Sequence, residues 1–254
     1  MRAVLCFIVI AMVSSFASAQ EEIKSIHVIV ALCDNDSQGI VPVPKTLGNG
    51  DDPKNNLYWG ALYGTKSYLK RSKDWTLLET RKKVDKVILE RVIFKHHKKP
   101  VYLVADAYRG VHIKKAVEDF FHSVAENQSQ TVQYKETKIG IKGKADLTVY
   151  VGHNGLMDFQ LAPIAAKEDN PVHGAIVLAC KSKAYFKPVL SKVGSRSVLL
   201  TTGFMAPEAY TLEAALAGWI AGESPTQIKE RSAQAYHKYQ KCGLKGARRL
   251  FYSE

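Results

Sequence analysis

Two stretches decide the fold of this chain, Asp146-Leu-Thr-Val-Tyr-Val-Gly-His153-Asn-Gly155 and Gly174-Ala-Ile-Val-Leu-Ala-Cys180. Each contains a short apolar run of the kind that is typical of a buried parallel strand, and each run leads to a reactive side chain. Ligands bind at the carboxyl ends of strands in open parallel sheets, so we expect His153 and Cys180 to lie side by side on one edge. A thiol beside an imidazole is a nucleophile with its base.

Strand-like and helix-like runs alternate along most of the chain, which predicts an α/β fold of three layers, α-β-α, with a mostly parallel sheet. Further strands are predicted at Ile26–Leu32, Val101–Ala105 and Ser197–Thr202. The polar stretch 127–144 is interpreted as a loop or a short edge strand. Apolar residues at helical spacing predict helices at 57–69, 81–97, 111–125, 184–193, 207–222 and 224–241.

Two connections are expected near the predicted site. The polar stretch 34–56 is rich in Gly, Pro, Asp and Asn, and loops of that length in compact domains are usually functional or disordered. It leaves the edge where His153 and Cys180 are placed. The turn Thr201–Pro207 also follows a strand, and it either borders the same cleft or only caps the next helix.

The first nineteen residues are predicted to be a secretory signal peptide. Met1-Arg2 is a short basic start, Val4–Val13 is an apolar stretch, and Ala17-Ser18-Ala19 is a small-residue cleavage site. The apolar stretch is about ten residues long, short of the ~20 that a membrane span needs. We therefore expect cleavage after Ala19, a secreted or periplasmic protein without a transmembrane segment, and one domain over residues 20–254.

The formal net charge of +12 allows several partners. Basic residues cluster at 95–99 and 248–249, but a solvated basic surface is the interpretation we favour. There is no zinc-finger spacing and no RNA-recognition motif, so no specific nucleic-acid partner is predicted. No spacing of His, Cys, Asp or Glu indicates a metal site, and no cofactor is predicted. The oligomeric state stays open.

Three cysteines remain once Cys6 leaves with the signal peptide. An odd number argues against a disulfide framework in an exported chain and leaves at least one free thiol. We take Cys180 as the free thiol and Cys33, which also ends a strand, as part of the core. Whether Cys33 pairs with Cys242 stays open.

The motifs around His153 and Cys180 resemble those of the caspase-like cysteine peptidases, the clan that also includes legumains, metacaspases, gingipains and clostripain. In that family one hydrophobic strand is followed by His-Gly and a second by Ala-Cys or Gln-Cys. Here the pattern is Val149-Tyr-Val-Gly-His153 and Ile176-Val-Leu-Ala179-Cys180. The resemblance implies a caspase-hemoglobinase-like fold with a roughly six-stranded sheet, His153 as catalytic histidine and Cys180 as nucleophile. It also implies a peptide or protein substrate.

The oxyanion formed by attack on a carbonyl needs N–H donors, and Gly155 and Cys180 are the predicted ones. The chain departs from the family pattern here, because Asn154 stands between His153 and Gly155. The interval of 27 residues from His153 to Cys180 is also shorter than in the better known branches.

Acidic residues near the predicted edge are candidates for substrate recognition or for orienting His153. Asp34 and Asp36 follow the first strand, and a pocket built on them would bind Lys or Arg of a substrate. Ordinary turn chemistry also explains Asp residues at this place, and we favour that interpretation. Asp158 and Asp106 are further candidates for orienting His153 or lining the edge.

Two functional hypotheses follow. The first is an exported cysteine endopeptidase that uses a His153/Cys180 dyad to cleave peptide bonds, with cleavage after a basic residue as the specificity that an Asp34/Asp36 pocket would give. The second is a catalytically inactive caspase-like domain that serves as a binding or scaffold module in the periplasm or outside the cell.

Overall fold

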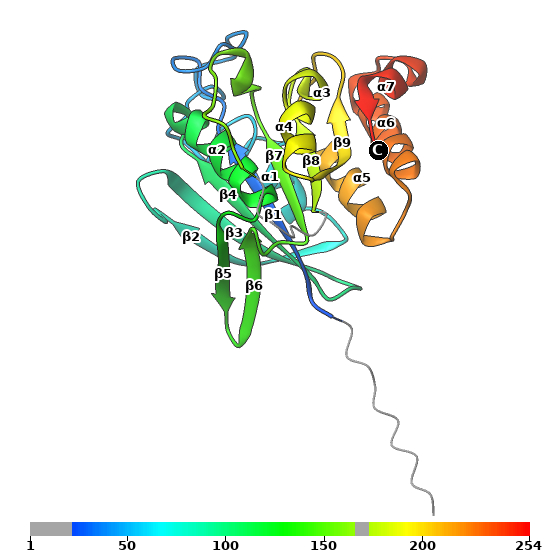
Figure 1. Cartoon of the computed structure of the whole chain (residues 1–254). Coiled ribbons are helices and arrows are strands. Elements are labelled where there is room, and N and C mark those ends of the chain that lie inside the picture. Colours follow the sequence, from blue (N-terminus) through cyan, green and yellow to red (C-terminus); the bar gives the residue numbers. More distant parts are fainter. Residues whose placement is uncertain (1–21, 166–172) are drawn as a thin grey trace, which may run out of the picture.

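The computed structural model describes residues 22–165 and 173–254 (Figure 1). The predicted signal peptide lies outside these residues. The main sheet has eight strands in the order β10-β9-β8-β7-β1-β4-β3-β2. Their bounds are β1 Lys24–Ala31, β2 Trp75–Lys82, β3 Ile88–His96, β4 Val101–Tyr108, β7 Leu147–Val151, β8 Gly174–Leu178, β9 Arg196–Thr201 and β10 Phe251–Tyr252.

The centre of this sheet is parallel, as predicted. Strands β9, β8, β7, β1 and β4 pair with parallel neighbours, whereas β10, β3 and β2 are added at the two edges through antiparallel pairings. Every residue of β4, β7 and β8 is buried, which explains why these strands appear in the sequence as continuous apolar runs.

Helices cover both faces of the sheet (Figure 1). Alternate side chains of β1 point to opposite faces: Ile26, Val28 and Val30 face a core shared with α1, α5, α6 and α7, and Ile29 and Ala31 face α2 and α4. The bounds are α1 Thr65–Lys70, α2 Ile113–Val124, α3 Ser182–Tyr185, α4 Lys187–Lys192, α5 Ala209–Ile220, α6 Pro225–Gln240 and α7 Leu244–Leu250, with the 3₁₀ turns η1 Gly110–His112 and η2 Gly155–Met157.

A separate two-stranded hairpin, β5 Ser129–Tyr134 and β6 Thr137–Lys142, occupies the stretch interpreted as a loop or edge strand. It does not join the main sheet but lies across it, where Ile139 packs with Ile93 and Val104. The hairpin therefore covers part of the same face of the sheet as α2.

The predicted start of α6 is confirmed. The side chain of Ser224 accepts a hydrogen bond from the Gln227 N–H, the side chain of Gln227 accepts one from the Ser224 N–H, and Pro225 occupies the first turn. In the part of the chain that the structure describes, neither α6 nor any other helix has the length and apolar character required to cross a membrane.

The prediction of a helix at 81–97 is wrong. This segment forms the end of β2, a turn, and β3, with the Asp85 carboxylate accepting hydrogen bonds from the N–H groups of Val87 and Ile88 in the turn (both 2.7 Å). Both faces of β3 are covered by other elements, so its sequence lacks the strict alternation of a half-exposed strand. Its β-branched residues were the better signal.

The expected strand count and some helix bounds also differ. The main sheet has eight strands and not roughly six, because β3 and β2 extend one edge and β10 extends the other; the sequence did not predict these three strands. Of the helix predicted at 57–69, only α1 forms, preceded by turns. Helix α7 and β10 lie beyond the last predicted element, where a seven-residue helix and a two-residue strand leave almost no periodic signal.

Candidate functional site

A cleft of about 340 Å³ lies at the carboxyl edge of the parallel strands. We call it the Cys180 cleft. It is built from the segments that follow β1, β7, β8 and β9, where the strand order of the sheet changes direction. Its lining residues are Gly39, Ile40, Val41, Val43, Tyr58, Gly152, His153, Met157, Cys180, Phe204, Met205 and Pro207.

The cleft brings His153 and Cys180 together, as the sequence predicts. His153 follows β7, Cys180 follows β8, and these two strands are direct parallel neighbours. The loop 34–56 contributes Gly39 to Val43, and the turn 201–207 contributes Phe204 to Pro207, so both connections expected near the site border it.

The His153 ring is held in one orientation. Its side chain is only 7% exposed, and its Nε2 atom lies 2.7 Å from Asp158 Oδ2. The Gly39 N–H donates to the same carboxylate oxygen (3.1 Å). When Nε2–H donates to this carboxylate, Nδ1 keeps the lone pair that accepts a proton in base catalysis. Of the two acidic candidates for orienting His153, the structure places Asp158 there.

Gly39 has little room for a side chain. A Cβ atom at this position would lie 2.5 Å from Asp158 Oδ1, which is closer than real Cβ contacts allow. The absence of a side chain therefore lets the loop approach the carboxylate and donate its N–H. Gly39 was not singled out in the sequence, because a glycine in a polar loop carries no specific signal.

The backbone of His153 is also fixed. The buried Tyr150 hydroxyl and the Gly155 N–H both donate to the His153 carbonyl oxygen, at 2.8 Å and 3.1 Å. These contacts hold the turn between β7 and η2. They also use the Gly155 N–H, which therefore does not serve as an oxyanion donor in this conformation.

The sulfur of Cys180 lies against the turn that follows β9. The Met205 N–H approaches Cys180 Sγ at 3.4 Å, and Sγ lies 3.6 Å from the Met205 carbonyl oxygen. These two backbone contacts hold the sulfur against the turn at one wall of the cleft. Met205 could not be singled out in the sequence, because any non-proline residue supplies these backbone groups.

The chain turns sharply after Cys180. Lys181 adopts the left-handed region, with φ of 50°, and its N–H donates to the Gly203 carbonyl oxygen (2.8 Å). Behind this turn Ser182 Oγ donates to the Val177 carbonyl oxygen (3.0 Å) and accepts from the Thr201 N–H (2.8 Å). The segment carrying the thiol is thus tied to both β8 and β9.

Asn154, the residue that departs from the family pattern, joins the two strand ends. Its side chain is fully buried, and its Nδ2 donates to the Cys180 carbonyl oxygen at 2.7 Å. Its Oδ1 accepts from the Leu156 N–H (3.2 Å), which begins η2. Asn154 therefore sets the separation of the histidine and cysteine segments.

Asp34 and Asp36 do not line the Cys180 cleft. The Asp34 carboxylate accepts hydrogen bonds from the N–H groups of Asp36 and Ser37 (2.9 and 3.2 Å), and Asp36 is exposed. This is the turn chemistry favoured for these residues. The structure therefore does not assemble the acidic substrate pocket that was considered for them.

Asp106 does not orient His153 either. Asp106 is fully buried on the face of the sheet that the β5–β6 hairpin covers. Arg91 donates two hydrogen bonds to its carboxylate (2.6 and 2.8 Å), and His27 Nε2 lies 3.1 Å away. Burial raises the pKa of this carboxyl, but the hydrogen bonds from Arg91 and His27 outweigh burial and hold the pKa below its ordinary value. Asp106 belongs to a structural ion network.

The other cysteines have different surroundings. Cys33, Cys180 and Cys242 are all free thiols in the described residues. Cys33 is fully buried, as expected for a core residue, and burial raises its pKa to about 11. Cys242 is exposed after α6. Within residues 22–165 and 173–254, no group of three or more His, Cys, Asp or Glu side chains is arranged to hold a metal ion.

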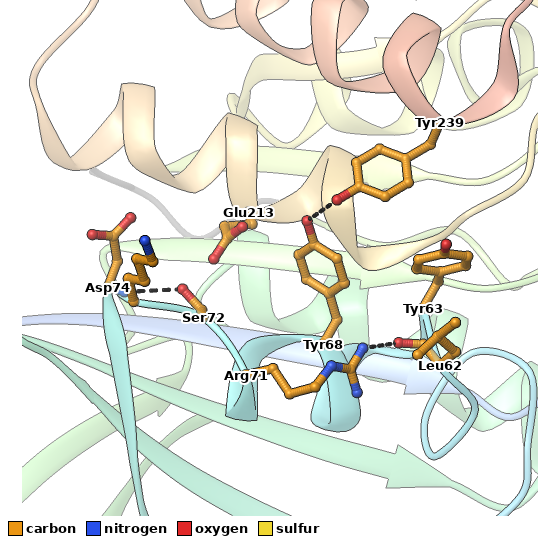
Figure 2. Close-up of a pocket in the computed structure, with 9 residues that line it drawn as sticks. Leu62, Tyr63, Tyr68, Arg71, Ser72, Asp74, Glu213 and Tyr239 are labelled. Atoms are coloured by element: carbon orange, nitrogen blue, oxygen red, sulfur yellow. Dashed lines mark hydrogen bonds between the residues drawn. The ribbon is translucent and has the colours of Figure 1, made fainter.

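A second cavity, of about 570 Å³, lies between α1, the turn before β2, α5 and α6 (Figure 2). The hydroxyls of Tyr68 and Tyr239 are 3.0 Å apart, and Tyr239 stacks on Tyr210 with a centroid distance of 4.2 Å. Glu213 faces this cavity, and burial raises the pKa of its carboxyl. These tyrosine contacts hold α1 against α5 and α6. This cavity does not include His153 or Cys180 in its lining.

In comparisons with known proteins, no family model matches this chain, and no match was found among curated proteins or solved structures. The observations that bear on function are therefore the geometry of the Cys180 cleft and the two sequence motifs that meet there.

Proposed function

We propose that the protein is a cysteine endopeptidase of the caspase-like type, with Cys180 as the nucleophile and His153 as the general base and acid. One observation carries the proposal. Both side chains line one cleft at the carboxyl edge of a parallel sheet, and the histidine is oriented by the Asp158 carboxylate. The α-β-α architecture supports the family assignment.

The proposed reaction begins when Cys180 Sγ attacks the peptide carbonyl carbon while its proton moves to His153. The C–N bond then breaks, the imidazolium gives its proton to the leaving amine, and a thioester remains on Cys180. Water loses a proton to His153, hydrolyses the thioester and restores the thiol. This chemistry needs no metal or organic cofactor.

Two groups complete the proposed machinery. Asp158 keeps the proton on Nε2 and stabilises the imidazolium that forms during the reaction, as a third triad member does. The Cys180 N–H is the oxyanion donor that we retain, since the Gly155 N–H donates to the His153 carbonyl oxygen.

We also propose that the protein acts after export, either secreted or in the periplasm. The support is the composition of residues 1–19, with its basic start, apolar stretch and small-residue cleavage site. The proposed substrate is a peptide or protein.

The hypothesis of an inactive caspase-like binding module has one observation in its favour. Because the Gly155 N–H is engaged within its own turn, the oxyanion would have fewer donors than the sequence predicted. Removing one such donor costs about 10²- to 10³-fold in kcat in a well-studied peptidase. Hydrolysis measurements distinguish the two hypotheses.

The test is hydrolysis of a peptide library by the mature chain, residues 20–254. The rates of Cys180→Ala, His153→Ala and Cys242→Ala are compared with that of the parent under the same conditions. We expect the first two substitutions to reduce the rate by at least about 10²-fold. Cys242→Ala is the matched control, because its exposed thiol lies outside the cleft, and it should retain activity. Equal rates in Cys180→Ala and the parent would reject the peptidase proposal.

A further inference from the structure

We infer that the Cys180 cleft accepts a large apolar side chain, aliphatic or aromatic, from the residue whose carbonyl Cys180 attacks. This inference rests on the proposed peptidase function and names its substrate class. An apolar preference differs from the basic preference that an Asp34/Asp36 pocket would give.

The lining of the cleft is mostly apolar. Apart from Gly39 and Gly152, the side chains around His153 and Cys180 are aliphatic, aromatic, Met or Pro. They come from three segments far apart in the chain, namely the loop after β1, the η2 turn and the turn after β9. Tyr58 lies in the wall and is 7% exposed, and burial raises its pKa well above the ordinary value, so it stays neutral.

The charged side chains near the cleft are already engaged in contacts within the protein. Among the residues that the structure describes, no Asp, Glu, Lys or Arg lines the cleft. The nearby Asp158 carboxylate is bound by His153 and by the Gly39 N–H. Lys181 Nζ lies over the Phe204 ring, 4.5 Å from its centroid. A charged substrate side chain in the cleft would therefore lose water without gaining a partner, which is strongly unfavourable.

Two large apolar side chains at the cleft are exposed to solvent. Phe204 is 69% exposed and Val41 is 87% exposed, although both are large apolar residues beside a reactive thiol. A volume of about 340 Å³ is near the lower end of ligand pockets, which suits one side chain rather than an extended ligand. Full burial of a Leu or Phe side chain corresponds to roughly a 10- to 100-fold gain in binding.

The experiment uses four peptide acyloxymethyl ketones that differ only in the residue before the electrophile: Leu, Phe, Lys or Asp. The rate at which each labels Cys180 in the mature chain is measured by peptide mass spectrometry. Iodoacetamide, which carries no side chain, reports the reactivity of the same thiol. We expect the Leu and Phe probes to react at least about 10-fold faster than the Lys and Asp probes.

Two variants locate the preference in the cleft. Phe204→Ala should reduce the advantage of the Phe probe, and Leu62→Ala is the matched control because Leu62 is a comparably exposed apolar residue at the other cavity. Met157→Glu places a carboxylate in the lining of the cleft and should raise the rate of the Lys probe. Met157 is 38% exposed, so this change is compatible with folding.

The outcomes separate the two claims. If iodoacetamide labels Cys180 rapidly in a His153-dependent manner but the Lys or Asp probe is fastest, the apolar preference is wrong and the peptidase proposal stands. If neither iodoacetamide nor any probe labels Cys180, the peptidase proposal fails and the preference fails with it.

Discussion

The side-chain amide of Asn154 donates a hydrogen bond to the carbonyl oxygen of Cys180, at a distance of 2.7 Å. The residue before Asn154 is the proposed base, and Cys180 is the proposed nucleophile. Their strands are neighbours in the sheet, but strand pairing ends at Val151 and Leu178. The amide continues the connection beyond the last pair, and so it fixes the two reactive segments relative to each other.

Asn154→Asp should therefore loosen the site without changing the size of the side chain. Aspartate cannot donate to the Cys180 carbonyl oxygen, and the lost hydrogen bond of a buried group costs about 1–3 kcal/mol of stability. We expect a lower melting temperature together with a lower rate of Cys180 labelling. Thermal denaturation and labelling of the folded protein measure the two effects. Unchanged stability in this variant would contradict the role given to Asn154.

Asp158→Asn should impair catalysis more than folding. The carboxylate is 35% exposed, but it orients His153, and an amide at this position destabilises the imidazolium. We expect a decrease in kcat on the order of 10²- to 10⁴-fold with a folded protein. The pH dependence of kcat should change as well, which a purely structural role would not produce.

Gly39→Ala tests the same contact from the other side. A Cβ at residue 39 would displace the Asp158 carboxylate, so this variant should share the defect of Asp158→Asn. Gly246→Ala is the matched control, because within the described residues a Cβ there would meet no atom within 4 Å outside its own stretch of α7. Normal activity in Gly39→Ala would remove the support for a positioned Asp158.

Part of this site could be predicted from the sequence, and the reason is physical. Strands buried on both faces are continuous apolar runs, and parallel neighbours end at one edge, so His153 and Cys180 could be placed together. The donor from Met205 and the contact from Gly39 are backbone groups, which the residue type does not reveal. Asp158 could be named only as one of two candidates for orienting His153. The η2 turn, which directs its carboxylate toward His153, leaves no periodic pattern in the sequence.

The prediction for β3 failed for a related reason. Apolar residues of β3 face both sides of the sheet: Val92 and Phe94 pack in the core that includes α1, and Ile93 packs under the β5–β6 hairpin. Val84, Val87, Ile88 and Val92 then fall at helical spacing by chance. Periodicity alone cannot distinguish a strand covered on both faces from an amphipathic helix in such a segment.

Cys33 should resist alkylation in the folded protein. Burial raises its pKa to about 11, and the hydrogen bond from Tyr58 only partly offsets burial. At pH 8 almost all of this thiol is protonated, and its side chain is inaccessible. Mass spectrometry after iodoacetamide treatment should find Cys33 modified only when denaturant is added. Rapid modification of Cys33 in native protein would show that the core opens around β1.

Glu213→Gln should change the pH dependence of stability. Burial raises the pKa of Glu213 in the folded protein above its ordinary value, and the Asp74 carboxylate adds to the shift. The folded protein then binds a proton more tightly than the unfolded chain, so this group lowers stability as pH rises through the interval between the two pKa values. Removing the charge should stabilise the protein at pH 7.

Thermal denaturation of the parent and Glu213→Gln between pH 4 and pH 8 measures this effect. The advantage of the variant should shrink as the pH falls, because Glu213 becomes protonated in both states. An advantage that grows on acidification would have the opposite sign from the one expected.

Comparing two thiols of one protein sample tests whether His153 activates Cys180. The mature chain is treated with limiting iodoacetamide at neutral pH, and the modification rates of Cys180 and Cys242 are determined in the parent and in His153→Ala. Cys180 is less exposed than Cys242, so accessibility alone would make it slower. We predict that Cys180 reacts faster in the parent and that His153→Ala, shown to be folded, abolishes this advantage. A slower Cys180 whose rate is unaffected by His153→Ala would mean that His153 and Cys180 do not form a catalytic pair.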